Sequence, residues 1–500
     1  MFRMLLSNAE KMRNADREAI AGGVSSVGLM ARAAEYVADS AHEYSVGGKS
    51  VYVFCGSGNN GGDGIGAAAI MKEWGANVRA FLVGSREKMT DDSKAMEQRL
   101  IAAGGELEAF NPDIDISDAG VIIDALFGVG LSRNIEGNAA KAIEMINASG
   151  AKVVAADIPS GVCADTGAIL GCAVKADVTI TFSMAKIGHF VEPGCTMCGE
   201  VEVCDIGIPE EYLRDAGAGV YALDRADVIL PRRNPISHKG DYGKLLILGG
   251  SIGYTGAPCL CARAAVRSGA GLVSLGVPEA VYPICAVKSA EEMVFPLPCE
   301  NGKLTEAAYG AIAERMRASH ICVLGMGLGR SEGITKLVHR IVAESEIPLL
   351  IDADGLNALA EDMRVLKKAK APVVLTPHEG EFARLGGILS GNRTEDARRF
   401  AKEYNCILVL KGHRTIIAQP DGEVYITTYG TPGMAKGGTG DVLAGIIGAM
   451  MGQLPLERAV RTGVYIHSLG GEFACSEWSE YSMTAGDIIE KIADVTTILQ

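Results

Sequence analysis

The sequence predicts two α/β domains, the first of them built on a parallel β-sheet that helices cover on both faces. Apolar runs of strand length alternate with helical patterns nearly throughout the chain, which is typical of parallel strands buried on both faces. In the first half these runs are residues 51–55, 78–83, 121–126, 153–157, 178–182 and 201–204. In the second half they are residues 244–248, 272–277, 321–324, 348–352, 373–376 and 407–410. Two further short strands, 415–418 and 424–427, end the second half differently, which indicates a fusion of unlike domains rather than a duplication.

The length of the chain also favours two domains. Its 500 residues exceed what one hydrophobic core usually supports. The alternating pattern weakens over residues 210–219, and a basic, proline-containing stretch follows at 231–235 before the strands resume. We therefore expect one domain over residues 1–218 and a second over residues 219–500.

The composition argues against several classes of partner. The formal net charge of -14 works against binding to nucleic acid or to anionic membranes. No run approaches about 18 apolar residues, and residues 1–9 lack the apolar core of a secretory signal. We therefore expect a cytoplasmic protein without nucleic-acid or membrane partners, which forms homo-oligomers and binds small molecules.

The cysteines are best interpreted as reduced core residues. There are 13 of them, an odd number, scattered through apolar segments. Cys195 and Cys198 form a CxxC pair, but no matching second pair follows that would complete a zinc site.

A glycine-rich loop at residues 56–64 follows the first predicted strand. Backbone N–H groups in such a loop can hold an anion at the start of the next helix. Residues 56–61 satisfy the GxGxxG pattern, but the next strand lacks the acidic residue that a dinucleotide site requires at its end. The core of the loop supplies two amides and a carboxylate, which are hard oxygen ligands and hydrogen-bonding partners. A structural turn, which also favours Asn and Asp, is the alternative.

Two more carboxylates, Asp124 and Asp157, end predicted strands in the first half. Because the carboxyl ends of parallel strands meet at one edge of a sheet, both acids and the glycine-rich loop are expected to face one crevice. For either residue alone, a helix cap would explain its position equally well.

Residues 59–64, 124–133 and 157–161, together with the opening segment 10–16, resemble the NAD(P)H-hydrate epimerase domain of the YjeF N-terminal family over about residues 7–210. The resemblance implies a Rossmann-like sheet and a K+ ion held by Asn60, Asp124 and Ser160. The implied contacts to the hydrated coenzyme come from Asn59, Asn60, Gly61, Gly62, Asp63, Gly128, Val129, Gly130, Leu131, Ser132, Arg133, Asn134 and Asp157. Asp157 is the expected catalytic acid, a role for which burial would have to raise its pKa.

The strongest pattern in the second half is the segment 431–441, which runs into the helical stretch 442–451. Successive glycine N–H groups at a helix start form an anion hole, and Asp441 is placed to accept a proton from a hydroxyl that attacks phosphorus. The segment therefore predicts phosphoryl transfer. A tight turn would also use glycines, but it would not require the Thr and Asp that accompany them.

Gly438, Thr439, Gly440 and Asp441 resemble the ribokinase-like superfamily. Segments 239–244, 249–251, 254–258, 267–272, 325–329, 376–382 and 411–412 resemble its ADP- or ATP-dependent NAD(P)H-hydrate dehydratases, over about residues 222–490. His378 favours a dehydratase, because several kinases of the superfamily carry Asn there. The implied contacts to the hydrate are Ala257, Gly327, His378 and catalytic Asp441, and those to the nucleotide are Lys411, Gly412, His413, Arg414, Thr415 and Gly440.

The expected co-substrate of the second half is ADP or ATP with Mg2+, the ion lying near Glu381. Lys411, Arg414 and Lys436 are the cations expected near the phosphates, with solvated surface charge as the alternative.

Three functions compete at this point: repair of the hydrates NADHX and NADPHX, a small-molecule kinase with an accessory domain, and a nucleotide-binding regulator without catalysis. A kinase would explain Asp441 but not Asn59 or Asp157. A regulator would bind nucleotide without turnover. Repair explains both halves, because an epimerase makes the R hydrate available to a dehydratase that takes the S hydrate.

Overall fold

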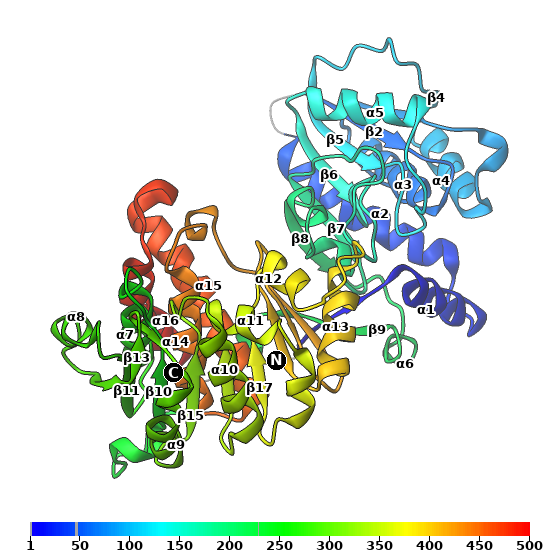
Figure 1. Cartoon of the computed structure of the whole chain (residues 1–500). Helices are drawn as coiled ribbons and strands as arrows, with labels where there is room; N and C mark the ends of the chain where they lie inside the picture. The colour runs from blue at the N-terminus through cyan, green and yellow to red at the C-terminus, as the bar shows by residue number, and fades with distance from the viewer. Residues whose placement is uncertain (1–2, 46–48, 229) are drawn as a thin grey trace. The chain divides into compact units, whose positions relative to one another are not determined.

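The chain divides into two compact units in the computed structural model, which describes residues 3–45, 49–228 and 230–500. One unit comprises Leu5–Val220 and the other Tyr221–Gln500 with the described residues before Leu5. The colours of Figure 1 follow this division, from blue to green in the first unit and from green to red in the second. The expected boundary at residues 218 and 219 falls inside strand β9 (Gly217–Leu223), so the chain passes the boundary along a strand and not through an irregular linker.

The first unit is built on a seven-stranded parallel sheet with the order β4-β3-β2-β5-β6-β7-β8. Its strands are β2 (Ser50–Cys55), β3 (Val78–Leu82), β4 (Leu107–Ala109), β5 (Ala119–Ala125), β6 (Lys152–Ala156), β7 (Val178–Phe182) and β8 (Glu200–Cys204). The six strand runs expected in this half are confirmed. The edge strand β4 escaped prediction because its three residues are too short for an apolar pattern.

Helices cover both faces of this sheet, as expected. They are α1 (Ala9–Ala21), α2 (Ser26–Tyr44), α3 (Asn59–Glu73), α4 (Asp91–Ala102), α5 (Gly137–Ala148) and the short α6 (Glu210–Leu213). Side chains of β2 alternate between two cores: Val53 packs with the residues of α1 to α4, and Phe54 packs with those of α5. The sheet is therefore apolar on both sides, which explains the unbroken apolar runs.

The second unit contains an eleven-stranded sheet with the order β1-β9-β20-β19-β18-β17-β16-β15-β10-β11-β12. Besides β1 (Met4–Ser7) and β9, its strands are β10 (Lys244–Leu248), β11 (Leu272–Pro278), β12 (Met293–Leu297), β15 (Ile321–Leu324), β16 (Leu349–Ile351), β17 (Val373–Leu375), β18 (Ile407–Leu410), β19 (Ile416–Ala418) and β20 (Val424–Thr427). The strands from β12 to β18 run parallel, and the two short strands expected at the end of this half, β19 and β20, are antiparallel. Strand β12 was not expected, since most of its residues are partly exposed at the sheet edge.

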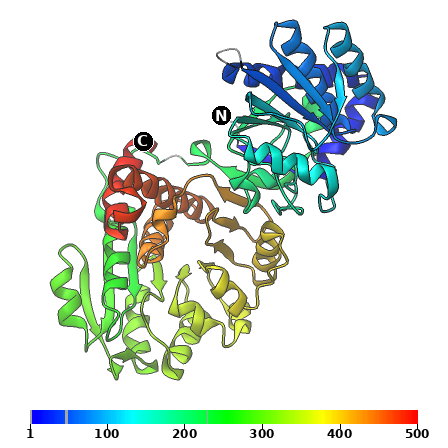
Figure 2. The same cartoon turned by 90° about the horizontal axis from the view of Figure 1, so that it is seen from above.

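The helices of the second unit follow its strands in the α/β manner. They are α7 (Gly256–Arg267), α8 (Tyr282–Lys288), α9 (Tyr309–Arg317), α10 (Glu332–Glu344), α11 (Asp354–Leu359), α12 (Glu379–Arg384), α13 (Arg393–Tyr404), α14 (Thr439–Met451), α15 (Leu456–Ser482) and α16 (Ala485–Leu499). A small ribbon of β13 (Cys299–Glu300) and β14 (Lys303–Leu304) lies outside the main sheet. Helices α14, α15 and α16 pack against one another (Figures 1 and 2).

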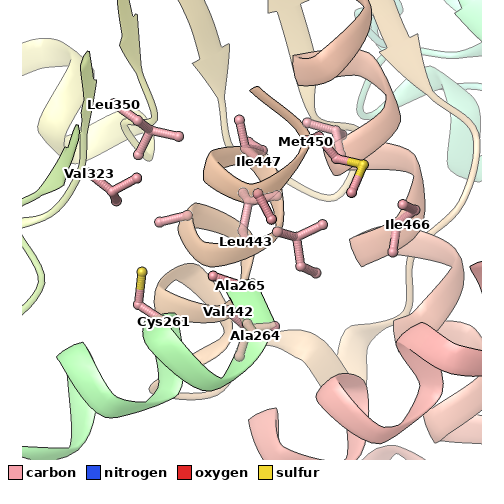
Figure 3. Close-up of a cluster of buried hydrophobic side chains, with 14 of the residues drawn as sticks. Cys261, Ala264, Ala265, Val323, Leu350, Val442, Leu443, Ile447, Met450 and Ile466 are labelled. Atoms are coloured by element: carbon pink, nitrogen blue, oxygen red, sulfur yellow. The ribbon is translucent and has the colours of Figure 1, made fainter. Parts of the chain in front are cut away.

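Helix α14 is buried on every side and anchors the second unit. All residues from Val442 to Met451 are buried, and they pack against α7, α15 and the sheet (Figure 3). Gly445 allows the closest approach, because a Cβ there would lie 2.1 Å from the backbone oxygen of Cys261. The start of α14, which carries Asp441, is therefore held in a rigid frame.

Among the described residues, no helix combines the length and the apolar character that crossing a membrane requires. The 13 cysteines are free thiols.

Candidate active sites

A cavity of about 970 Å³ opens in the first unit where β2, β5, β6 and β7 end. Ten of the residues singled out in the sequence line it: Asn59, Asn60, Asp63, Gly128, Val129, Gly130, Leu131, Ser132, Arg133 and Asp157. Gly61 and Gly62 are buried beneath its wall, Asp124 and Ser160 lie fully buried behind it, and Asn134 is outside the lining.

The glycine-rich loop becomes the first turn of α3, which begins at Asn59. Two glycines are required there by space. A Cβ on Gly61 would lie 1.8 Å from the backbone oxygen of Gly56, and one on Gly62 would lie 2.7 Å from Ser93 Oγ. The loop therefore packs tightly enough to turn the Asn and Asp side chains toward the cavity.

Asp124 and Asn60 each offer a buried oxygen of the kind that binds a cation. Asp124 is fully buried, and its carboxylate accepts hydrogen bonds from Ser160 N at 2.7 Å and Ser160 Oγ at 2.6 Å. Burial raises the pKa of Asp124 to about 6, although the hydrogen bonds from Ser160 lower it. The side-chain oxygen and nitrogen of Asn60 are buried and have no hydrogen-bond partner among the described residues. A buried carboxylate and an orphaned amide oxygen are donors that a hard cation satisfies.

Asp157 does not have the raised pKa that the sequence suggested. Its carboxylate accepts a hydrogen bond from Lys186 Nζ, whose side chain is only 1% exposed, and another from Thr181 Oγ1 at 3.2 Å. Burial by itself would raise the pKa of Asp157, but the ammonium of Lys186 and its hydrogen bond lower it below the ordinary value. Lys186 lies 29 residues further along the chain, so the sequence around Asp157 does not reveal this partner.

His189 is a neutral histidine whose ring forms hydrogen bonds with the backbone of both residues of this ion pair. Its Nδ1 accepts a hydrogen bond from Lys186 N at 3.1 Å, and its Nε2 lies 3.0 Å from the backbone oxygen of Asp157, to which it can only donate. One accepting and one donating ring nitrogen is the pattern of a neutral imidazole. Burial, and secondly the nearby ammonium of Lys186, lower the pKa of His189 to about 3.

Two further carboxylates, Asp16 on α1 and Asp63 on α3, line the same cavity. Burial, and secondly the charge of Asp157, raise the pKa of Asp16 to about 6. Burial, Asp157 and Asp16 raise the pKa of Asp63 as well. In the sequence, Asp16 stands out only as the last residue of the opening segment 10–16.

In the second unit, acids and one lysine gather where β16, β17 and β18 end. Lys411 Nζ lies 2.8 Å from Asp352 Oδ1 and 3.7 Å from Glu381 Oε2. Burial opposes the charge of Lys411 most strongly, but Asp352, Glu381 and Asp441 together raise its pKa. Lys411 is thus a paired, charged group and not a solvated surface cation. Asp352 was not singled out in the sequence, although the strand-end argument used for Asp124 applies to it.

Asp441 lies in the first turn of α14 beside this cluster. Gly438, with φ of +97°, caps the helix, and a Cβ on Gly440 would lie 3.6 Å from Lys411 Nζ and 3.8 Å from Asp352 Oδ2. Burial, and secondly Asp352, raise the pKa of Asp441 to about 7, while Lys411 lowers it. A carboxylate with this pKa can accept a proton near neutral pH.

The other predicted residues of the second unit fall into two groups. Gly327 and Ala257 are neighbours, since a Cβ on Gly327 would lie 3.5 Å from Ala257 Cβ. His378 caps α12: its Nδ1 accepts from Gly380 N at 3.0 Å and from Glu381 N at 3.3 Å, and its Nε2 lies 3.6 Å from Glu381 Oε1.

Three of the residues expected at the nucleotide make contacts within the protein. Lys436 Nζ donates to the backbone oxygens of Tyr481 at 2.6 Å and Met483 at 2.7 Å, so it fastens the end of α15. Arg414 donates to the backbone oxygen of Thr428, and Thr415 Oγ1 donates to the backbone oxygen of Gly412 at 3.4 Å.

Comparison with known proteins gives matches for both units. Residues 245–494 match the family model described as NAD(P)H-hydrate dehydratase, and residues 26–188 match the model of the YjeF-related protein N-terminus. The chain is similar to the bifunctional NAD(P)H-hydrate repair enzyme of Moorella thermoacetica, with 39% identity over 97% of this chain and 96% of that protein. It is similar to that of Thermofilum pendens, with 40% identity over 96% of this chain and 94% of that protein. A crystal structure of a ribokinase-like superfamily protein from Enterococcus faecalis is 26% identical, with a TM-score of 0.50, over 56% of this chain and 97% of that one.

The neutral state of His189 predicts a pH dependence of stability in the first unit. The unfolded chain protonates this histidine below pH about 6.5, whereas the folded chain does so only near pH 3, so acidification favours unfolding. His189→Gln removes the effect. Between pH 6.5 and 5, the free energy of unfolding should therefore fall less steeply in the variant, by up to about 1.4 kcal/mol per pH unit.

Urea unfolding followed by Trp74 fluorescence measures this difference in a Trp478→Phe background, where Trp74 is the remaining tryptophan. If the free energy of unfolding falls equally steeply with and without the His189→Gln substitution, His189 is not neutral in the folded chain.

Proposed function

The chain belongs to the family of bifunctional NAD(P)H-hydrate repair enzymes, and we propose that its two units catalyse consecutive steps of one repair reaction. The enzyme converts hydrated NADH and NADPH back to the reduced coenzymes. Residues 1–218 interconvert the R and S hydrates at ring carbon 6, and residues 219–500 dehydrate the S form with ADP or ATP. With ADP the products are AMP and phosphate.

The observation that carries this proposal is Asp441 at the glycine-rich start of α14, beside the cluster of Lys411 and Asp352. The backbone N–H groups of the turn suit a phosphate, and a neighbouring carboxylate suits the removal of a proton from an attacking hydroxyl. A plain nucleotide-binding regulator needs the first feature but not the second.

Dehydration then proceeds by activation of a poor leaving group. Asp441 takes the proton of the C6 hydroxyl, whose oxygen attacks the terminal phosphorus of the nucleotide. The phosphoanhydride bond to that phosphorus breaks, and AMP leaves from ADP, or ADP from ATP. The ring nitrogen donates its electron pair to C6 as the C6–O bond breaks and phosphate leaves. Loss of a proton from C5 restores the dihydronicotinamide ring.

The remaining predicted residues of the second unit have holding roles in this proposal. Ala257, Gly327 and His378 hold the hydrate. Residues 411–415 and Gly440 hold the nucleotide. Mg2+ would neutralise the phosphates near Glu381, which faces Lys411 across 3.7 Å.

In the first unit, Asp157 acts as an ionised carboxylate. Departure of the C6 hydroxyl leaves a positive charge shared by N1 and C6 of the ring, and return of water to the opposite face completes the epimerisation. A fixed negative charge in the cavity stabilises that cation. Its pairing with Lys186 keeps Asp157 in the required form.

Asn60, Asp124 and Ser160 would hold K+ in this proposal. Asn60 offers an orphaned amide oxygen, Asp124 a buried negative charge, and Ser160 a hydroxyl that already donates to Asp124. The ion would neutralise Asp124 and hold the start of α3 against the end of β5.

Cytoplasmic location and homo-oligomer formation are further parts of the proposal. The net charge of -14 supports the absence of nucleic-acid and membrane partners.

Asp157→Asn should abolish epimerisation, with a loss of about 10²-fold or more, because the cation loses its counter-charge. The substitution also leaves the buried ammonium of Lys186 without its counter-charge, which costs about 3–5 kcal/mol of stability in the first unit. Adding Lys186→Met to this variant should restore most of the stability without restoring epimerisation. Chromatographic separation of the R and S hydrates and urea unfolding measure the two effects. Normal turnover in either variant would remove Asp157 from the mechanism.

K+ should stabilise the first unit by satisfying Asn60 and Asp124. Thermal unfolding in KCl should occur at a higher temperature than in choline chloride of equal concentration, by an amount that grows with the K+ concentration. Asn60→Ala should abolish the difference. An equal gain in the wild type and the variant would exclude these residues as the K+ site.

Asp441→Asn should lower dehydration of the S hydrate by about 10²–10⁴-fold and leave nucleotide binding largely intact. The wild-type rate should rise with pH through about 7, because the base must be deprotonated, and the variant should lose this dependence. The increase in absorbance as NADH forms measures the rate, and Glu403→Gln, an exposed site on α13, is the matched control. Retained dehydration would contradict the assignment.

A further inference from the structure

The cavity of the first unit requires a proton donor that Asp157 cannot be. The C6 hydroxyl must leave as water, since hydroxide is a poor leaving group. Lys186 keeps Asp157 ionised, and Lys186 itself is committed to three acceptors: Asp157, Thr181 Oγ1 at 2.8 Å and the backbone oxygen of Phe182 at 3.3 Å. His189 is neutral and uses both ring nitrogens.

The titratable side chains that line the cavity come from several elements. They are Arg13 and Asp16 from α1, Asp63 from α3, Lys88 and Asp92 from the segment around the start of α4, Arg133 after β5, Asp157 after β6 and Lys186 after β7. Asp157 raises the pKa of both Asp16 and Asp63, and the ammonium that counters it at both positions is Lys186. Because that ammonium already pairs with Asp157, its effect on the other two carboxylates does not outweigh burial, and the pKa of each stays raised.

Asp16 is the carboxylate that can exchange its proton with a ligand. Helix α1 is fixed at its start, where Asn8 caps it and Asp165 accepts a hydrogen bond from Ala9 N at 2.6 Å. Met12 and Ala15 bury the inner face of the helix, which places Asp16 at the border between that face and the cavity. Asp16 is half-buried and makes no hydrogen bond or ion pair with the described residues, so both of its oxygens are available.

Asp63 is placed differently. It lies one turn into α3, is only 9% exposed, and sits among the tightly packed glycines of the loop. Its pKa is raised well above the ordinary value, chiefly by burial. Asp63 therefore offers less of its carboxylate to a ligand in the cavity than the half-buried Asp16 does.

We propose that Asp16 is the acid and base of the epimerisation. The inference rests on the proposed function of this cavity. Asp16 transfers its proton to the C6 hydroxyl, the C6–O bond breaks, and the electron pair of N1 forms the N1=C6 bond as water departs. Asp157 stabilises the resulting cation. Water then adds to the opposite face of C6, the N1=C6 pair returns to N1, and the released proton goes back to Asp16.

The test compares Asp16→Asn with the wild-type full chain. The matched control is Glu18→Gln, which makes the same carboxylate-to-amide change at an exposed position of the same helix. Interconversion of purified R and S hydrates of NADH is followed without nucleotide, and dehydration of the S hydrate with ADP or ATP is followed separately. Spontaneous epimerisation is subtracted at each pH.

We expect Asp16→Asn to lower interconversion by about 10²–10⁴-fold and to leave dehydration of the S hydrate, a reaction of the second unit, unchanged. Urea unfolding followed by Trp74 fluorescence in the Trp478→Phe background checks that the first unit of the variant is folded. The wild-type kcat/KM should fall tenfold per pH unit above pH about 6, as the acid form of Asp16 is lost, and the variant's residual rate should not. Asp16→Glu should retain this fall of kcat/KM above pH about 6, the falling limb of the pH profile.

Three results would overturn the assignment. The first is an unchanged rate in Asp16→Asn. The second is a wild-type rate that does not fall between pH 6 and 8, a measurement that needs no variant. The third is loss of the falling limb in Asp63→Asn and its retention in Asp16→Asn, which would make Asp63 the donor. Failure of the wild type itself to interconvert the hydrates would instead overturn the proposed function of the cavity, and the role of Asp16 with it.

Discussion

The burial of carboxylates at the carboxyl edge of a parallel sheet is the constraint on which both sites depend. Ionised acids that leave water are stable only with a paired charge or with donated hydrogen bonds. Each unit solves this with a lysine that follows another strand of the same sheet. Lys186 pairs with Asp157 in the first unit, and Lys411 pairs with Asp352 in the second.

One lysine ammonium does not pair with every carboxylate of a site. The carboxylates of each site therefore differ in pKa. In the first unit Asp157 is held ionised while the pKa of Asp16 rises to about 6. In the second unit the pKa of Asp441 rises to about 7 beside the pair of Lys411 and Asp352. Carboxylates whose pKa values are pushed apart can take different roles in one reaction. The catalytic design thus follows from charge balance more than from the number of acidic residues.

The packing of the second unit explains why its site can be rigid. Helix α14 is apolar on every side, and its glycines let it approach α7 and the sheet closely. A helix so enclosed cannot shift its first turn without opening a cavity in the core. Lys436 adds to this rigidity by fastening the end of α15, a role that its position beside a glycine-rich loop does not reveal.

The sequence by itself determined the two α/β units, the strand runs, and the loops that carry Asn59, Asp157 and Asp441, because periodicity and turn chemistry are local properties. It did not reveal the edge strands β4 and β12, which are short or partly exposed and so lack an apolar pattern. Only the tertiary structure decided that Lys186 lowers the pKa of Asp157, that Asp352 joins the second site, and that Asp16 faces the first. The reason is that a pKa depends on burial and on charges a few ångströms away, and folding brings those charges from distant parts of the chain.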